Sequence, residues 1–132
     1  YGISPGQAAV FYDGIRLLGF VGDEDRRALY RAAAVLGFPS FHEGFGLPPL
    51  EAMASGTPVV ASCAGALGEI VGNAGILPDP YRPSEIADAL AAVLESPSLA
   101  EMYVMRGRAR AAEFSWEACA KKTAEAFAQA IG

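Results

Sequence analysis

Two kinds of hydrophobic pattern alternate along this chain. Short apolar runs predict buried strands over residues 15–20, 35–41, 57–62 and 75–77. Apolar residues that recur every three or four positions predict helices over residues 23–34, 48–55, 83–94 and 97–113, one helical turn at 66–71, and a last helix after Ser115. Ser96 and Ser115 are expected to cap the last two helices. This alternation is typical of an α/β fold, with a Rossmann-like parallel sheet and flanking helices. Residues 1–14 show no clear period.

A glycine-rich turn precedes the helix predicted at 48–55. Pro48 is expected to be the first helical residue and Gly56 the stop. Gly44 and Gly46 are expected to adopt positive φ, which lets a ligand approach the backbone closely. The turn would then point its amides outward at a helix N-terminus, where anions bind. These amides belong to Phe45, Gly46 and Leu47.

Two carboxylates lie eight residues apart around this turn, on Glu43 and Glu51. Glu51 is expected in the first helical turn, where its carboxylate can accept hydrogen bonds from hydroxyls of the same ligand. An anion together with a set of hydroxyls indicates a nucleotide sugar. The plain alternatives are a surface loop carboxylate for Glu43 and, for Glu51, an acid that only favours the helix dipole.

The composition limits the possible functions. With 132 residues, 52% of them hydrophobic, the chain can form one domain with a packed core. Its net charge of −5 argues against nucleic acid as a partner, because that binding depends on Lys and Arg. Neither a membrane span nor a signal peptide is expected. Cys63 and Cys119 are expected to be free thiols, which predicts a reducing, cytoplasmic location.

Basic residues avoid the stretch that holds the turn. No Lys or Arg lies between residues 32 and 81. Amide dipoles alone would stabilise a departing diphosphate poorly, and transferases commonly supply Arg, Lys or a metal ion at that point. No metal and no other cofactor is expected here.

The residues from Pro39 to Ser62 resemble the donor-binding motif of the family-four retaining glycosyltransferases, also called glycosyl transferases group 1. The pattern of that family is Pro-Ser, then Glu-Gly-Phe-Gly-Leu-Pro, then Glu-Ala-Met-Ala, then Gly-x-Pro-Val-Val. Its four parts begin here at Pro39, Glu43, Glu51 and Gly56. Flanking segments are similar as well, so that the resemblance covers residues 15–132. Position 68, usually proline in the family, is Gly in this chain.

The resemblance implies a GT-B architecture, in which two Rossmann-like domains hold the donor between them. Residues 1–132 would form a partial nucleotide-sugar-binding domain, the later part of the C-terminal domain, with 1–14 unassigned and the acceptor domain outside this sequence. In the usual strand order 3-2-1-4-5-6, the strand at 35–41 would lack its neighbour on one side. We expect that edge to be covered by the strand at 15–20, by residues 1–14 or, as we favour, by a second copy through dimerisation or a domain swap.

The function implied by the resemblance is retaining transfer of a hexose from a UDP- or GDP-sugar to a saccharide or lipid-linked acceptor, as in polysaccharide biosynthesis. Glu43 would be the catalytic residue, touching hydroxyls of the transferred sugar rather than acting as a nucleophile. Glu51 would bind the ribose. Backbone contacts to the base are implied at Gly19, Phe20 and Val21. The remaining donor contacts would come from Gly44, Phe45, Gly46 and Leu47.

In the resembling family an Arg and a Lys for the diphosphate come from a segment upstream of residue 15. This chain by itself is therefore expected to show no appreciable turnover, and its full-length parent is expected at the inner face of the membrane. His42 is expected at the rim of the site, and Trp116 as a packing anchor. Two alternatives stay open: a non-catalytic remnant that binds nucleotides weakly or serves as an interaction module, and a sugar-nucleotide epimerase of similar fold.

Overall fold

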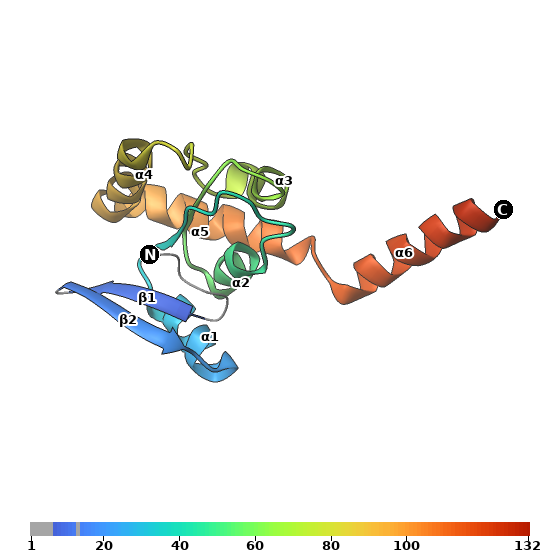
Figure 1. Cartoon of the computed structure of the whole chain (residues 1–132), viewed down its shortest axis with the longest axis horizontal. Coiled ribbons are helices and arrows are strands. Elements are labelled where there is room, and N and C mark those ends of the chain that lie inside the picture. Colours follow the sequence, from blue (N-terminus) through green and yellow to red (C-terminus); the bar gives the residue numbers. More distant parts are fainter. Residues whose placement is uncertain (1–6, 13) are drawn as a thin grey trace.

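The structure is a computed structural model that describes residues 7–12 and 14–132, with side chains described from residue 18 onward. Its strands are β1 (Gln7–Tyr12), β2 (Gly14–Phe20), β3 (Leu36–Phe38) and β4 (Val59–Ala61). Its helices are α1 (Asp23–Ala32), α2 (Leu47–Ser55), α3 (Leu67–Val71), α4 (Pro83–Glu95), α5 (Pro97–Ala112) and α6 (Trp116–Ile131), with a short 3-10 turn, η1 (Gly72–Ala74). Figure 1 shows α6 extending away from the other elements.

β3 and β4 form the parallel sheet that the apolar runs predict. Leu36 lies opposite Val59, and the ladder continues to the end of both strands. The strand predicted at 75–77 is reduced to a single parallel bridge between Ile76 and Val60. Both strands are shorter than their apolar runs. Pro39 follows β3 directly and Pro58 precedes β4, and a proline has no N–H to donate to a ladder.

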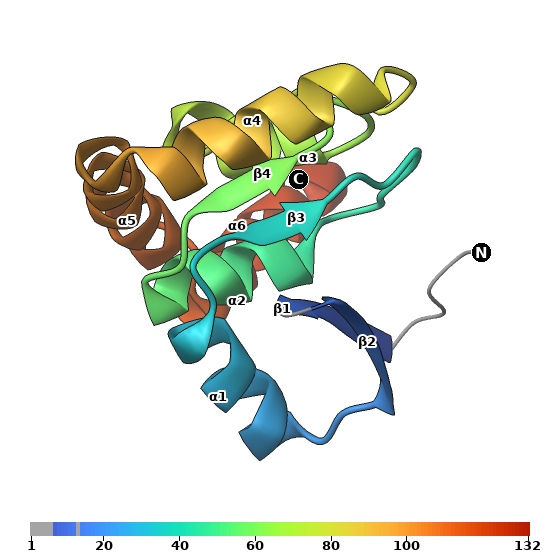
Figure 2. The ribbon, with the colours of Figure 1, turned by 90° about the vertical axis from the view of Figure 1, so that its left-hand side faces the viewer.

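β4 is buried on both faces because its side chains alternate between two clusters. Val60 packs with Val93 of α4. Its neighbours Val59 and Ala61 pack instead with Met53 of α2. Figure 2 shows α4 on one side of β4 and α2 on the other. Burial of this kind is typical of a parallel strand, and it confirms the predicted α/β class with helices on both faces.

The prediction for residues 15–20 is right about conformation and wrong about the sheet. β2 pairs antiparallel with β1, with Phe11 opposite Ile15, and these two strands form a sheet of their own. An Asp-Gly pair at positions 13 and 14 of the sequence is a strong hairpin signal that accounts for this partner. β2 therefore does not cover the free edge of β3. Within the described residues, β3 has a strand on one edge only.

Three predicted helix caps are confirmed. Ser96 Oγ accepts a hydrogen bond from Leu99 N at 3.3 Å, and Ser115 Oγ accepts one from Ala118 N at 3.0 Å. Gly56 ends α2 in the left-handed region, with φ of 85°. The start of α2 differs from the prediction by one residue, because Leu47 precedes Pro48 in the helix.

α6 has no buried residue. Its apolar side chains are open to solvent, with Trp116 83% and Ile131 85% exposed. The prediction that Trp116 is a packing anchor is wrong for the described chain, because α6 leaves the body directly after its cap (Figure 1). In the part of the chain that the structure describes, no helix combines the length and the hydropathy needed to cross a membrane.

Candidate functional site

The glycine-rich turn lies after the carboxyl end of β3, where open α/β sheets bind their ligands. Gly46 adopts the left-handed conformation that was predicted, with φ of 107°, and its carbonyl accepts the first α-helical bond of α2, from Leu50 N. A Cβ on Gly46 would lie 2.8 Å from Leu67 Cδ2 of α3, so only glycine fits. The prediction for Gly44 is wrong, because its φ is not positive. A Cβ on Gly44 would meet no atom of the described residues within 4 Å.

The first turn of α2 has few amides and no capping side chain. Its first three residues are Leu47, Pro48 and Pro49, and the two prolines carry no N–H. No side chain caps the helix. Glu51 is the fifth helical residue and lies just beyond the first turn, one position later in the helix than predicted, because α2 begins at Leu47. Amides near Gly46 and Leu47 are thus the donors that α2 offers at this end.

Glu43 is held by its backbone against the loop between β4 and α3. Its carbonyl accepts a hydrogen bond from Ala66 N at 3.1 Å. Gly65 of that loop has φ of 59°, and a Cβ there would come within 2.6 Å of Glu43 O and 3.0 Å of Glu43 N. The close approach therefore requires glycine at position 65. The side chain of Glu43 is half-buried, on the same loop as the exposed His42, which is the predicted rim residue.

Hydrogen bonds fix the start of the turn. Ser62 is fully buried after β4, and its Oγ donates to Ser40 O. Ser40 Oγ in turn donates to His42 O at 2.9 Å. Backbone pairing continues alongside, from Ser62 N to Phe38 O at 3.1 Å. The turn is thus tied to the ends of both parallel strands.

Phe45 connects the turn to the end of α5. Its ring meets Phe114 edge to face, with ring centroids 6.2 Å apart. Phe114 also lies under the guanidinium of Arg110, 4.8 Å from the ring centroid. Arg110 donates to Ile70 O at 3.0 Å and to Glu69 O at 2.6 Å, at the C-terminal end of α3. One arginine thereby links α5, α3 and the aromatic residue of the turn.

The Glu51 carboxylate faces two side chains of α1. Arg26 Nη2 donates to Glu51 Oε1 at 3.4 Å, and Arg26 Nε lies 3.3 Å from Oε2 as an ion pair without hydrogen-bond alignment. The Tyr30 side chain lies beside the same carboxylate. Burial raises the pKa of Tyr30 to about 12, and the negative charge of Glu51 adds to the rise.

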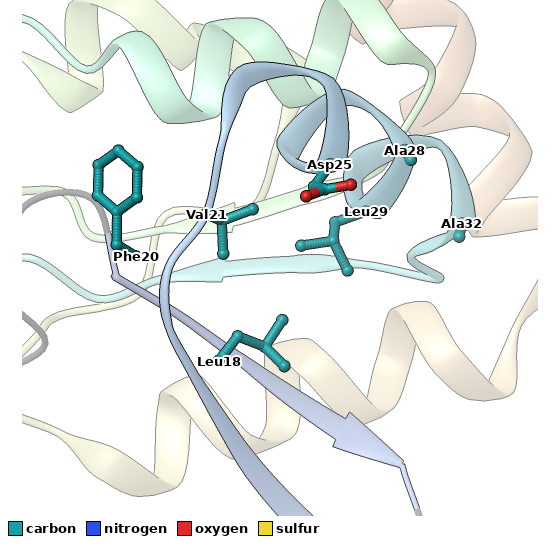
Figure 3. A pocket seen from close by; sticks show the side chains of 7 residues that line it. All are labelled: Leu18, Phe20, Val21, Asp25, Ala28, Leu29 and Ala32. Carbon is teal, nitrogen blue, oxygen red and sulfur yellow. The ribbon is translucent and has the colours of Figure 1, made fainter.

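Phe20 and Val21 line a hollow of about 420 Å³ beside α1, shown in Figure 3. In that view the side chains of Leu18, Val21 and Leu29 point into the same space. Among the described residues of the lining, Asp25 is the one that carries a charge. Gly19, the third residue implied at the base end, has φ of 68°. Of the predicted site residues, Phe20 and Val21 thus lie on one side of α1, whereas Glu51 contacts its other side.

Comparison with known proteins identifies the relatives of this arrangement. A family model described as glycosyl transferases group 1 matches residues 8–110. The chain belongs to this family. It is 47% identical over 113 residues to O-antigen chain mannosyltransferase B of Escherichia coli. The matched region covers 86% of this chain and 30% of that glycosyltransferase. The chain thus spans less than a third of the length of this curated relative.

Two solved structures of glycosyltransferases resemble the fold. Sucrose-phosphate synthase of Thermosynechococcus elongatus matches with a TM-score of 0.76 and 36% identity, over 86% of this chain and 29% of that one. The C-terminal domain of a glycosyl transferase group 1 family protein from Francisella tularensis matches with a TM-score of 0.64 and 35% identity, over 73% of this chain and 51% of that one. The predicted fold is confirmed as part of the C-terminal domain of a GT-B glycosyltransferase.

Sequence reasoning missed four residues that this glycosyltransferase domain places around the motif. They are Arg26, Tyr30, Gly65 and Arg110. The two arginines come from outside the stretch 32–81 that has no basic residue. The spacing of Arg26 and Tyr30 by four signals a shared helix face. No local pattern reveals that this face meets Glu51, which lies 25 residues after Arg26.

Proposed function

We propose that this domain binds the nucleotide diphosphate sugar donor of a retaining hexosyltransferase that acts on a saccharide or lipid-linked acceptor. The observation that carries the proposal is the turn before α2. It combines a left-handed Gly46, an uncapped helix start and a Gly44 beside which the described residues leave open space. A phosphate that approaches the backbone there would account for a glycine that the fold itself does not need.

The roles of the other motif residues follow from where they lie. The diphosphate would accept hydrogen bonds from amides of Phe45, Gly46 and Leu47, at the positive end of the α2 dipole. Glu43 would bind hydroxyls of the transferred sugar. The braces on its backbone, from Ala66 N and the close approach of Gly65, support a fixed position for it.

Transfer with retention would take place on one face of the sugar. The bond from the anomeric carbon to the diphosphate oxygen breaks while the acceptor oxygen approaches from the same side, and the acceptor proton goes to the departing diphosphate. Negative charge grows on that diphosphate, so donors fixed in advance are what the site has to supply. Helix amides supply part of this, and we infer that cationic side chains outside the described site supply the rest.

The base end of the donor would lie at Gly19, Phe20 and Val21. The hollow beside α1 is lined mainly by apolar side chains, which suits the flat face of a base. Glu51 would accept a hydrogen bond from the ribose, between the base end and the turn. UDP and GDP are the two nucleotides that we propose.

Titration calorimetry with GDP-mannose, UDP-glucose and the free diphosphates tests the proposal on the chain as it stands. We expect saturable binding of one nucleotide series, with the free diphosphate competing against its sugar. A stable, folded chain that binds none of the four compounds at millimolar concentration would contradict the proposal. That result would favour the alternative of an interaction module without a nucleotide site.

A further inference from the structure

Two faces of α1 contact different surroundings, the hollow on one side and α2 on the other. Asp25, Ala28, Leu29 and Ala32 line the hollow, at spacings of three and four residues that put them on one side. Arg26 and Tyr30, four residues apart, face α2 instead. On this second face, both side chains lie beside the Glu51 carboxylate of α2.

The guanidinium of Arg26 is held between two carboxylates. Its Nη2 lies 3.2 Å from Asp23 Oδ1, one turn back on α1, and 3.4 Å from Glu51 Oε1. Its Nε is 3.3 Å from Glu51 Oε2, so the same edge of the guanidinium spans both oxygens of Glu51. The contact with Asp23 holds the guanidinium ready for Glu51.

Tyr30 approaches the same carboxylate from a fixed backbone. Its carbonyl accepts a hydrogen bond from Thr57 Oγ1, and Thr57 is fully buried. A tyrosine hydroxyl is protonated at neutral pH, and here burial and the charge of Glu51 raise its pKa further, to about 12. It can therefore donate a hydrogen bond to Glu51 at neutral and mildly alkaline pH.

We propose that Arg26 and Tyr30 are positioning residues that fix the Glu51 carboxylate for one hydroxyl of the donor ribose. A carboxylate offers about four acceptor positions. Arg26 Nη2 uses one of them and the Tyr30 hydroxyl can use a second, which leaves positions for the ligand. The inference rests on the proposed function, because it gives Glu51 a ribose to bind.

A purely architectural ion pair is a poor explanation of this arrangement. The side chains of Arg26 and Glu51 are each 40% exposed. Ion pairs with that exposure add little to stability, typically up to about 1 kcal/mol. Two donors from one helix converging on one carboxylate do, however, remove its rotational freedom. That freedom matters when a ligand has to be met at a fixed angle.

The test compares how well variants distinguish ribose from a sugar without hydroxyls. Calorimetry measures the dissociation constants of GDP and UDP against their 2′,3′-dideoxy analogues, for the unaltered chain and for the variants Arg26→Gln, Arg26→Lys, Tyr30→Phe and Glu51→Gln. Arg27→Gln is the matched control, since it removes the same charge from the neighbouring, exposed position of α1. Thermal melting confirms that each variant is folded.

We expect the unaltered chain to prefer the ribonucleotide by about tenfold, the value of one hydrogen bond to a charged group. Glu51→Gln and Arg26→Gln should reduce this preference to nearly none, with Tyr30→Phe and Arg26→Lys in between. Arg27→Gln should keep it. A merely structural role would weaken the binding of both nucleotide types equally and leave their ratio unchanged.

The failure of this inference differs from the failure of the proposed function. If Glu51→Gln abolishes the preference while folded Arg26→Gln and Tyr30→Phe keep it, Glu51 binds ribose without help and the positioning role is wrong. If the unaltered chain binds no nucleotide, both the proposed function and this inference are overturned.

Discussion

The two glycines of the turn before α2, Gly44 and Gly46, differ in whether the fold requires glycine at their position. Gly46 is required by the protein itself, because its φ of 107° and its contact with Leu67 exclude any side chain. Gly44 has neither constraint. The sequence alone predicts the same conformation for both, since glycine permits positive φ without requiring it. Under the proposed function, Gly46 is therefore needed for folding and Gly44 for the ligand.

The first prediction concerns Gly44→Ala. We expect the free energy of unfolding to stay level or rise slightly, by up to about 1 kcal/mol, since the unfolded chain loses freedom and no clash arises. Nucleotide affinity should fall several-fold, because the methyl group would stand where the diphosphate approaches. Urea denaturation and calorimetry measure the two effects. Gly37→Ala is the control, with an added Cβ in ordinary contact, 3.5 Å from Leu90 Cδ2; an equal loss of affinity there would contradict the prediction.

The two motif carboxylates should differ in what they affect. In an active transferase that contains this domain, Glu51→Ala should weaken nucleoside diphosphate binding about tenfold or more, the cost of a lost charged hydrogen bond. Glu43→Ala should slow transfer while changing diphosphate affinity little. Equilibrium binding and single-turnover rates, measured on both variants, separate these effects. Small and equal changes in both variants would refute the assignment.

Tyr30 should dominate the alkaline limb of the stability curve. Its pKa is about 12 in the folded chain against 10 for a free tyrosine. The neutral hydroxyl is therefore favoured by folding, so the stability it contributes is fully present below pH 10 and is lost as the pH rises towards 12. A near-ultraviolet titration should find a tyrosine that ionises late, at about pH 12. This late step should be missing in Tyr30→Phe; a late step that remains there would assign it to another residue.

At the scale of elements, the residues beside each helix or strand determine where it begins and ends. The helices were predicted well because their caps, Ser96, Ser115 and Gly56, are local signals that the structure uses as such. The strands were predicted too long, since the prolines beside them limit the ladder whatever the apolar run suggests. For β2 the conformation was predictable and the partner was not. The Asp-Gly pair at positions 13 and 14 is typical of a hairpin, whereas the resemblance to the family implies a parallel sheet.

The brace between two loops gives a prediction at this scale. Gly65→Ala should lower the free energy of unfolding by about 1–3 kcal/mol, because a left-handed alanine is strained and its Cβ would collide with the backbone of Glu43. Gly68→Ala is the matched control in α3, where the nearest atom to the Cβ is Cys63 O at 3.8 Å. It should leave stability unchanged or raise it by up to about 1 kcal/mol. If chemical denaturation finds the same loss of unfolding free energy for both substitutions, the close approach of Gly65 to Glu43 does not contribute to stability.

The whole molecule combines a well-covered strand with an uncovered one. β4 has a neighbour on each edge and helices on both faces, whereas β3 has no second strand among the described residues. The absence of basic residues from 32–81 could be read from the sequence, but not the way in which Arg26 and Arg110 reach the motif from either side. Those contacts depend on how distant helices pack, for which a single sequence carries little information.

The free edge of β3 predicts self-association. An edge with unpaired amides and carbonyls recruits another strand, and a second copy of this chain offers one. Light scattering over a micromolar concentration series should give a mass above the 13.7 kDa of one chain, rising with concentration. A mass that stays at one chain throughout, with no strand added beside β3, would show that the edge is tolerated.

The two faces of α1 also bear on how such a domain can change. Residues 25, 28, 29 and 32 border the hollow, and residues 26 and 30 hold the acid on α2, so the two sets share a helix without sharing a position. Under the proposed function, substitutions in the first set would change the specificity for the base without weakening the binding of ribose. Libraries that vary only that set would explore new donors from a scaffold that still binds. α1 is therefore the place where an engineer would start.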